Sequence, residues 1–516
     1  MEIVFELPID LPRVRQSPST QAVYELLKAA IMAGELPPSS KLPPTRWAGR
    51  HFRLSRNTIG SIYERLASEG LVVSRRGSGT YVAANRRRLN PERSRKPTVD
   101  AATFVRPEWR DSSIRRNMRF CTDEPIRDPP PDALELRPGL VDLTMFPFDQ
   151  FRRCMVKTLR RMERSPPGPG CPQSFQGDFG LRQAIADHVA LMRSLVCEPD
   201  DILVTSGTQQ AFDLVTRVFV EPHRTLVAVE DPCYPPLVAA LKAAGALICP
   251  VPVDSEGIVV DQIPSEAKLI FACPSNQFPL GITMSAQRRR KLHEFSRSRR
   301  ALIIEDDYDG EFRTKGEPLK AIYSQEPADL VFYIGSFSKC MFPGVRLGYV
   351  IAPHWAIEPL VLAKNCTDWH SSSVIQAATA SFISEGHLST HVAKMRTAYR
   401  GRIAALLDAL SAKFDGRLRP IVPNYGTHVS AEGDPAVDWD AVAEKAQANR
   451  IQVHSLSRYH FGEGRPGLLF AVGSEPEARL RLAVERLSPS SDRRSLEFEL
   501  VVAEARGAVL PGWGLK

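Results

Sequence analysis

Several side chains able to take part in covalent and acid–base chemistry follow short apolar runs of the kind that form buried strands. Lys339 comes after the run LVFYIG, directly behind two serines in the segment SFSKC, and Arg346 follows soon after it. Asp306 and Tyr308 lie at the end of the run ALIIED, in the segment EDDYDG. A lysine at a buried strand end is costly as an ammonium ion, so its pKa falls. A lysine of lowered pKa is suited to forming a Schiff base with a carbonyl compound.

Two further runs have functional side chains beyond their ends. The run LVAVE leads into EDPCYPP, which places Tyr234 just past a strand end. The run ILVTS leads into SGTQQAFDL, where small residues open a helix. Because the first backbone amides of a helix can bind an anion, Gly207, Thr208 and Gln209 form a candidate phosphate site. Taken alone, this feature also fits an ordinary strand-to-helix turn.

The elements that must position these residues form one repeating pattern. Past Pro138, short apolar runs alternate with amphipathic helical stretches; the runs are ILVTS, LVAVE, ALICPV, LIFAC, ALIIED, LVFYIG and LGYVI. Continuous apolar strands separated by helices predict an α/β fold with a mostly parallel sheet covered on both faces. Ligands of such folds bind outside the carboxyl ends of the strands, which is where the side chains lie.

Together these residues match the requirements of pyridoxal 5′-phosphate (PLP). This cofactor needs a lysine for its Schiff base and a carboxylate that keeps its pyridine nitrogen protonated. Arginine and serine side chains bind its phosphate dianion. Ordinary structural roles stay open as alternatives, with Tyr308 as a packed core ring and Asp307 as a solvated turn acid. We predict PLP bound to Lys339.

The first hundred residues carry all of the excess positive charge. The 516-residue chain has 67 Lys and Arg and 59 Asp and Glu, a net charge of +8. Residues 1–100 hold 17 basic and 9 acidic residues, which is also +8, so the other 50 of each sign cancel. A basic segment joined to a neutral body is typical of a nucleic-acid-binding module. A solvated basic tail is the alternative.

The pattern of this segment favours the DNA-binding interpretation. Apolar residues recur at helical spacing between Ser19 and Gly34, and a second helix is predicted over Thr45–Phe52. Ser55 is placed to cap a third helix. The segment LVVSRRGSGTYV then predicts a β-hairpin. Three helices followed by a hairpin are typical of a winged helix-turn-helix.

The segments KLPPTR, LSRNTI and YERLASEGLVVSRRGSGTYV resemble the GntR family of bacterial transcription regulators over residues 19–82. The resemblance implies binding to double-stranded DNA. Its contacts would be two groove-facing arginines, two phosphate-binding hydroxyls and a wing: Arg46, Arg56, Ser55, Thr58, Arg75, Arg76, Gly77 and Gly79. Some positions depart from the family: Ala48, Gly49 and Arg53 replace its usual Leu, Ala and Gly, and Gly60 lies inside the third helix.

Residues 138–487 resemble the fold-type I aminotransferases, and most closely the MocR-type regulators, in which a GntR-type domain is fused to such a body. The resemblance implies that Lys339 carries PLP, that Asp306 pairs with the pyridine nitrogen and that Tyr308 pairs with the 3-hydroxyl group. Tyr234 would stack on the ring. The phosphate would be bound by Ser336, Arg346, Gly207, Thr208 and Gln209. A smaller C-terminal subdomain and a homodimer with paired DNA half-sites are also implied.

Three departures from the aminotransferase pattern bear on function. Phe278 precedes Pro279 where aminotransferases usually supply an asparagine, and Asn276 is the alternative donor to the ring oxygen. Phe175 stands where many relatives place a tyrosine that reaches the partner subunit's phosphate. The segment RPGLLFAVGS lacks the arginine that clamps the substrate carboxylate. Of the neighbouring arginines, Arg458 and Arg465, we choose Arg458 as the effector-binding residue.

These features predict four segments. Residues 15–83 are the DNA-binding domain, 84–137 a basic, proline-rich and extended linker, 138–487 the PLP-binding effector domain, and 488–516 an extension without an assigned role. The apolar runs are too short to span a membrane, and the acidic N-terminus does not fit a secretory signal. The nine cysteines are scattered without a C-x-x-C pair, so we predict neither disulfides nor a metal site and expect a cytoplasmic protein.

The leading hypothesis is a PLP-dependent transcriptional regulator of the MocR type. It would sense an amino-group ligand, or the cofactor itself, through the Schiff base of Lys339, without sustained turnover. One alternative is an active aminotransferase of the aminoadipate type with an accessory DNA-binding module. Another is a DNA-tethered scaffold that holds no cofactor.

Overall fold

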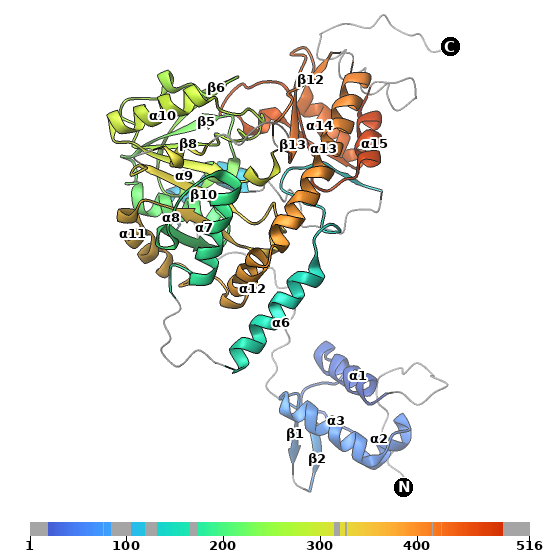
Figure 1. Cartoon of the computed structure of the whole chain (residues 1–516). Helices are drawn as coiled ribbons and strands as arrows, with labels where there is room; N and C mark the ends of the chain where they lie inside the picture. Colours follow the sequence, from blue (N-terminus) through green and yellow to red (C-terminus); the bar gives the residue numbers. More distant parts are fainter. Residues whose placement is uncertain are drawn as a thin grey trace, which may run out of the picture. The chain divides into compact units, whose positions relative to one another are not determined.

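The computed structural model describes residues 19–75, 77–83, 105–118, 132–164, 174–313, 320–325, 328–414, 416–424 and 426–488. The chain divides into two compact units, residues 1–101 and 102–516 (Figure 1). Each unit has its own hydrophobic core.

The N-terminal unit is the winged helix-turn-helix expected from the sequence. Its elements are α1 (Thr20–Ala33), α2 (Thr45–Phe52), α3 (Arg56–Ser68), β1 (Val72–Arg75) and β2 (Gly79–Val82). The hydroxyl of Ser19 accepts a hydrogen bond from the backbone N–H of Ala22, and Gly34 ends α1 with a left-handed φ of 79°. Strands β1 and β2 pair antiparallel as the wing. The three helices and the hairpin enclose one apolar core whose members include Val23, Leu27, Phe52, Ile59, Leu66 and Val82.

An eight-stranded sheet forms the centre of the second unit. Its strands, in spatial order, are β4 (Ile202–Thr205), β11 (Gly348–Ile351), β10 (Val331–Ser336), β9 (Leu302–Asp307), β8 (Leu269–Ala272), β5 (Leu226–Asp231), β6 (Leu247–Asp254) and β7 (Gly257–Ile258). Strands β10, β9, β8, β5 and β6 run parallel, whereas β11 and β7 are antiparallel to their neighbours. All seven predicted runs form strands of this sheet, so the predicted α/β fold is confirmed.

Helices cover both faces of the sheet because its central strands are apolar on both sides. One face packs against α8 (Thr208–Phe219), α9 (Pro235–Ala243) and α11 (His354–Asn365). The other face packs against a group that includes α6 (Phe148–Arg164), α7 (Phe179–Arg193), α10 (Ala286–Arg299) and α12 (Ser373–Ser384). The turns that follow the carboxyl ends of the parallel strands, including the N-termini of α8 and α9, hold the candidate site.

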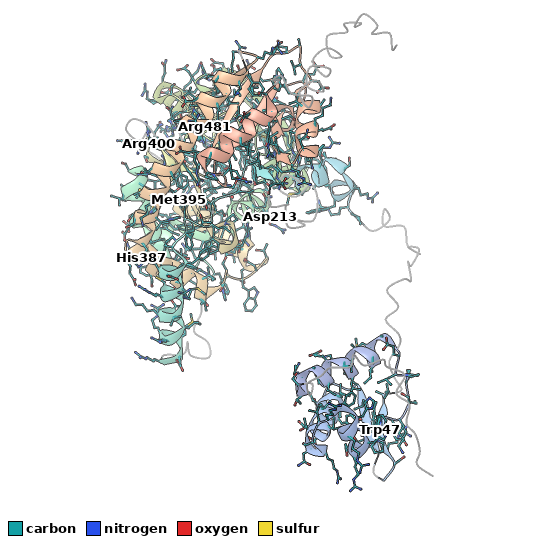
Figure 2. The ribbon with its side chains drawn as sticks, turned by 90° about the vertical axis from the view of Figure 1, so that its right-hand side faces the viewer. Trp47, Asp213, His387, Met395, Arg400 and Arg481 are labelled. Atoms are coloured by element: carbon teal, nitrogen blue, oxygen red, sulfur yellow. The ribbon has the colours of Figure 1, made fainter. Side chains whose placement is uncertain are left out.

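A smaller C-terminal subdomain completes the second unit, as expected. It has a four-stranded sheet of β12 (Leu418–Pro420), β13 (His428–Gly433), β16 (Gly467–Ala471) and β15 (His454–Ser455), with α14 (Trp439–Ala448) and α15 (Glu477–Leu487). The long helix α13 (His387–Lys413) joins it to the main sheet; Figure 2 shows His387, Met395 and Arg400 in succession along this helix. Met395 belongs to the core under the large sheet, whereas Ile403 belongs to the core of the subdomain.

The expectation of an extended linker over residues 84–137 is wrong for its described parts. Residues Pro107–Arg110 and Ser112–Met118 form the short helices α4 and α5, and Leu134–Glu135 forms β3, which pairs with β14 (Ile451–Gln452). The hydroxyl of Ser113 accepts a hydrogen bond from the ammonium group of Lys242, at 2.6 Å, which ties α5 to α9. Tertiary contacts therefore override the proline-rich local composition. Beyond Ser488, the predicted C-terminal extension lies outside the described residues. Within the described ranges, no helix is both long enough and apolar enough to cross a bilayer.

Candidate functional site

Asp306 lies in β9, and Lys339 lies just beyond the end of the neighbouring parallel strand β10. Asp306 is the penultimate residue of β9 and pairs in register with Ile334 of β10, while Lys339 follows the end of β10. Ser336, the last residue of β10, is buried, and its hydroxyl accepts a hydrogen bond from the backbone N–H of Ser338 at 3.1 Å. The register of β9 and β10 therefore brings a lysine, a carboxyl group and a hydroxyl to the carboxyl end of the sheet.

The carboxyl group of Asp306 lacks a strong partner. It is 8% exposed, its Oδ2 lies 3.9 Å from the thiol of Cys273, and its Oδ1 has no hydrogen-bond partner in the described part of the chain. Burial, together with the nearby charges of Asp307 and Asp309, raises the pKa of Asp306 to about 8, against a smaller opposing effect of Lys339. A buried acid of this kind fits a cationic ring N–H, which is what the pyridine nitrogen of PLP supplies.

A buried ion pair fixes the strand end that carries Asp306. The guanidinium Nε of Arg193 lies 2.7 Å from Oδ2 of Asp307, and both side chains are almost completely buried. The hydroxyl of Tyr333 also donates to Asp307, and Arg193 donates to the hydroxyl of Ser275. Asp307 is therefore not the solvated turn acid of the alternative interpretation. It anchors β9 to α7 and β10.

Tyr308 is hydrogen-bonded to an amide rather than packed as a plain core ring. The Nδ2 of Asn276 donates to the Tyr308 hydroxyl at 3.0 Å and to Oδ2 of Asp309 at 2.7 Å. Burial raises the pKa of Tyr308 well above its ordinary value, so the phenol stays neutral. Asn276 thus supplies an amide donor beside Tyr308, where Phe278 has replaced the usual asparagine.

The turn between β4 and α8 has the features of an anion-binding loop. Gly207 has a φ of 93° and directly precedes Thr208, the first residue of α8. The Nη2 of Arg346 donates to the carbonyl of Ser206 at 2.8 Å, and a Cβ at position 207 would lie 3.5 Å from the Arg346 guanidinium. The positive φ is what requires glycine here, because a Cβ at this distance would make only an ordinary contact with the guanidinium. These features fit a phosphate group.

The two glutamines of this loop differ in role. The side chain of Gln209 points away and donates to the carbonyl of Pro236 at 3.1 Å. Gln210, which sequence reasoning did not select, accepts a hydrogen bond from the backbone N–H of Ser206 at 2.7 Å and donates to Asp368 at 2.8 Å. Gln210 therefore braces the loop, while only the backbone of Gln209 remains for the predicted phosphate contact.

An aromatic cluster centred on Phe278 joins the large sheet to the C-terminal subdomain. The Phe278 ring packs edge-on against Tyr234 and Tyr308 of the large sheet, and against His428 and Tyr459 of the subdomain, with centroid distances of 5.3–5.9 Å. Burial lowers the pKa of His428 to about 4, so the imidazole is neutral and its Nε2–H donates to the carbonyl of Pro279. The local sequence around His428 carries no motif that would have marked this residue.

The remaining residues predicted near the ligand are less closely tied to this cluster. Arg458 lies on the short helix Leu456–Tyr459, next to Tyr459, and its assignment to the effector stays a prediction. Arg465 is paired with Glu432 at 2.7 Å. Phe175 packs edge-on against the exposed ring of Trp369.

The predicted DNA-contacting side chains lie mainly on the surface of the N-terminal unit. Arg46 and Arg56 are exposed at the first turns of α2 and α3. The Ser55 hydroxyl accepts a hydrogen bond from the backbone N–H of Thr58 at 3.1 Å and so caps α3. The Ser55 side chain is nevertheless exposed to solvent. Figure 2 shows Trp47 in this unit, on α2.

The wing is built by two glycines and a cation–π contact. Gly77 and Gly79 have φ values of 78° and 118°, which side chains rarely adopt. The guanidinium of Arg75 lies 5.0 Å from the ring centroid of Tyr81. Arg76 lies outside the described residues. The DNA contacts themselves stay predictions.

Comparisons with known proteins agree with this division. Residues 19–82 match the family of bacterial regulatory proteins of the gntR type, and residues 171–486 match aminotransferase class I and II. The chain is 30% identical to a probable rhizopine catabolism regulatory protein, MocR, of Rhizobium meliloti, over 92% of this chain and 93% of that protein. It is also 30% identical to the pyridoxine biosynthesis transcriptional regulator PdxR of Corynebacterium glutamicum, over 94% and 98%.

Solved structures resemble the second unit. A kynurenine aminotransferase of Pyrococcus horikoshii has a TM-score of 0.68 at 24% identity and covers 78% of this chain and 98% of its own. A multiple-substrate aminotransferase of Thermococcus profundus has the same TM-score at 25% identity, over 78% and 99%. The orphaned Asp306 carboxyl beside Lys339 fits PLP, the cofactor of such proteins. The chain belongs to the MocR-type transcriptional regulators, in which a GntR-family winged helix-turn-helix is joined to a PLP-binding domain of the aminotransferase class I and II fold.

Proposed function

We propose that this regulator senses a small amino-group ligand, or PLP itself, at Lys339 and converts its binding into a change of DNA affinity. The observation that carries the proposal is the buried Asp306 carboxyl, without a strong partner, at the strand end next to that of Lys339. Asp307 and Asp309 each have one oxygen held by strong donors, whereas within the described part of the chain the only hydrogen-bond contact of the Asp306 carboxyl is the distant thiol of Cys273. The Asp306 carboxyl is therefore the one available to a ligand.

Each residue near Lys339 has a definite part in this proposal. PLP, when bound, supplies an aldehyde that can exchange the Lys339 amine for the amine of a ligand. Asp306 would hold the pyridine N–H, and the neutral Tyr308 hydroxyl, oriented by Asn276, would donate to the ring oxygen. Tyr234 would cover the ring face. Ser336, Arg346 and the amides of Gly207, Thr208 and Gln209 would bind the phosphate.

The contacts between the two lobes of the second unit support a signalling role. Asp309 accepts hydrogen bonds from Asn276 of the large sheet and from the Thr427 hydroxyl of the subdomain. The buried hydroxyl of Ser430 on β13 likewise donates to the carbonyl of Pro279. A ligand that disturbs Tyr308 or Phe278 would therefore disturb the subdomain as well. Such a switch requires that the ligand prefer one arrangement over the other.

The decisive experiment follows light absorption and DNA binding together. We expect the purified chain to be yellow, to carry a PLP adduct on Lys339 after borohydride reduction and digestion, and to change its affinity for DNA upstream of its own gene when amino compounds alter its spectrum. The Lys339→Ala variant should be colourless and should bind DNA without responding. Sustained turnover of an amino acid and a keto acid with no effect on DNA binding would refute the proposal and favour the aminotransferase.

Assembly and location are also part of the proposal. Fold-type I domains of this class are typically dimeric, and a homodimer would present two winged helices to paired half-sites. A regulator that contacts operator DNA would work in the cytoplasm, associated with the nucleoid. The name of the PdxR relative makes PLP a sensible first ligand to test.

A further inference from the structure

Helix α6 carries a row of cations that no part of the PLP site uses. Arg153, Lys157, Arg160, Arg161 and Arg164 are all exposed. Successive members of this set are four, three, one and three residues apart. This spacing places all five within about 100° of the helix circumference. From the first to the last of these five residues the helix rises about 16 Å. We call these five residues the α6 basic row.

The opposite side of α6 anchors the helix to the second unit. Phe151, Cys154 and Thr158 are buried, and α6 packs along α12 (Figure 1). The basic row is therefore held on a fixed helix rather than on a loop. Its side chains, with Arg152 and Val156, border a shallow recess of about 650 Å³.

Most of the positive charge of this row is not neutralised. Lys157 pairs with Glu385 at 2.7 Å, and Arg152, which lies outside the row, pairs with Asp149 at 2.6 Å. Arg153, Arg160, Arg161 and Arg164 make no ion pair with any described residue. Residues 101–516 as a whole are neutral. The net charge of this part of the chain therefore gives no sign of the local positive charge along α6.

We propose that the α6 basic row is a second DNA-binding surface, which contacts phosphates independently of sequence while the winged helix reads the bases. Charge complementarity favours a polyanion, and the chain already belongs to a DNA-binding family. A second copy of the same face is a poor occupant, because a twofold interface would bring the two rows together. The proposal does not depend on the sensing function.

The salt dependence of binding separates this surface from its alternatives. Each phosphate contact contributes about 0.9 to the slope of log affinity against log salt concentration. The full-length Arg153→Gln, Arg160→Gln and Arg164→Gln triple variant should therefore show a slope smaller by about 2.7 on a long, labelled duplex of random sequence. Its affinity for this duplex at low salt should fall about tenfold or more. A duplex only long enough for the winged helix should be bound as by the wild type.

The chain offers a control with the same change of net charge. Arg290, Arg297 and Arg299 are exposed on α10 of the same unit, so their replacement by glutamine should leave the slope unchanged if the effect belongs to α6. Equal slopes for the α6 variant and the wild type would refute the proposal, as would equal losses in the two triple variants. Light scattering, which measures the oligomeric state of each protein, tests whether a second copy of the chain covers the row instead. If the α6 variant alone loses its dimer, the row belongs to a subunit interface and the DNA proposal is wrong.

Discussion

The amide nitrogen of Asn276 donates a hydrogen bond to the phenol oxygen of Tyr308, at 3.0 Å. This contact gives the site an oriented hydroxyl although Phe278 occupies the position of the usual asparagine. In this chain the amide donor to the phenol therefore comes from two residues earlier in the same turn. The neighbouring contact with Asp309 extends the link toward the C-terminal subdomain.

Removal of the Asn276 amide should weaken cofactor binding. In Asn276→Ala the phenol of Tyr308 loses its amide donor, and the loss of one such hydrogen bond costs about 0.5–1.5 kcal/mol. We expect the dissociation constant of PLP to rise by about twofold to tenfold, measured by titration of the apoprotein at the absorption maximum. Thr427→Val is the matched control, because it removes the other donor to Asp309 and leaves the Asn276–Tyr308 contact intact. An equal loss in both variants would assign the effect to Asp309 instead.

The buried carboxyls should make the cofactor-free chain less stable as pH rises. Burial raises the pKa of Asp306 and of Glu230 to about 8, and that of Asp309 to about 7, all above their ordinary values near 4. Between those limits the folded chain binds more protons than the unfolded chain, so the free energy of unfolding falls with pH. This penalty is absent below about pH 4 and complete above about pH 8.

Asp306→Asn tests the share of one group in that slope. Each titrating group contributes at most about 1.4 kcal/mol per pH unit, so the variant should show a shallower loss of stability in chemical denaturation of the apoprotein. At high pH it should be more stable than the wild type. Asp213→Asn, at a surface residue of α8 labelled in Figure 2, should leave the slope unchanged. A wild-type stability that rises between about pH 5 and pH 8 would contradict the assignment of these carboxyls as neutral.

The ion pair between Arg193 and Asp307 should be among the most sensitive in the second unit. Arg193→Gln leaves a buried carboxylate with a hydroxyl donor from Tyr333, and breaking a buried pair typically costs about 3–5 kcal/mol. We expect a marked drop in the thermal midpoint together with weaker PLP binding, because Asp306 shares the same strand end. Tyr333→Phe removes only the neutral donor and should cost about 1–3 kcal/mol. Equal losses in the two variants would mean that the guanidinium contributes nothing beyond a hydrogen bond.

Residues that follow local patterns, such as the ends of apolar strands, can be assigned to the site from the sequence, whereas residues joined only by tertiary packing cannot. Lys339 and Asp306 could be paired because each ends an apolar run, and parallel strands bring such ends together. Arg193 could not be found in this way, since it lies on α7, far along the chain from Asp307, and only tertiary packing joins them. The α6 basic row was hidden for a different reason. Opposite charges elsewhere in the body cancel it in any sum over the sequence.

The described part of the predicted linker shows the same limit. Its proline and arginine content favours an extended chain, yet α5 packs against α9 and β3 pairs with a strand of the subdomain. Composition describes what a segment prefers by itself, whereas docking on a preformed surface can supply the missing stability. The winged helix was easier to predict, because its caps and turns are encoded within a few residues of one another.

The departures from the GntR pattern identify two substitutions that should stabilise the N-terminal unit. Gly60 lies inside α3, and an added Cβ would meet no atom within 4 Å. Alanine is favoured over glycine in a helix interior by about 1 kcal/mol, so Gly60→Ala should raise the free energy of unfolding by about that amount. Arg53 ends α2 with a left-handed φ of 55°. Glycine adopts this conformation without steric cost, so Arg53→Gly should gain up to about 1 kcal/mol.

A matched substitution at the neighbouring glycine tests whether these gains arise from local backbone geometry. A Cβ at Gly49 would lie 2.9 Å from the carbonyl oxygen of Leu54, inside the turn that joins α2 to α3. Gly49→Ala should therefore destabilise the unit, although alanine is the family's usual residue there and the better helix former. Calorimetric unfolding of the three full-length variants should place the transition of the N-terminal unit above that of the wild type for Gly60→Ala and Arg53→Gly, and below it for Gly49→Ala. A stabilising Gly49→Ala would show that α2 and α3 can separate without cost, and the helix-turn-helix would then tolerate the family sequence as well as its own.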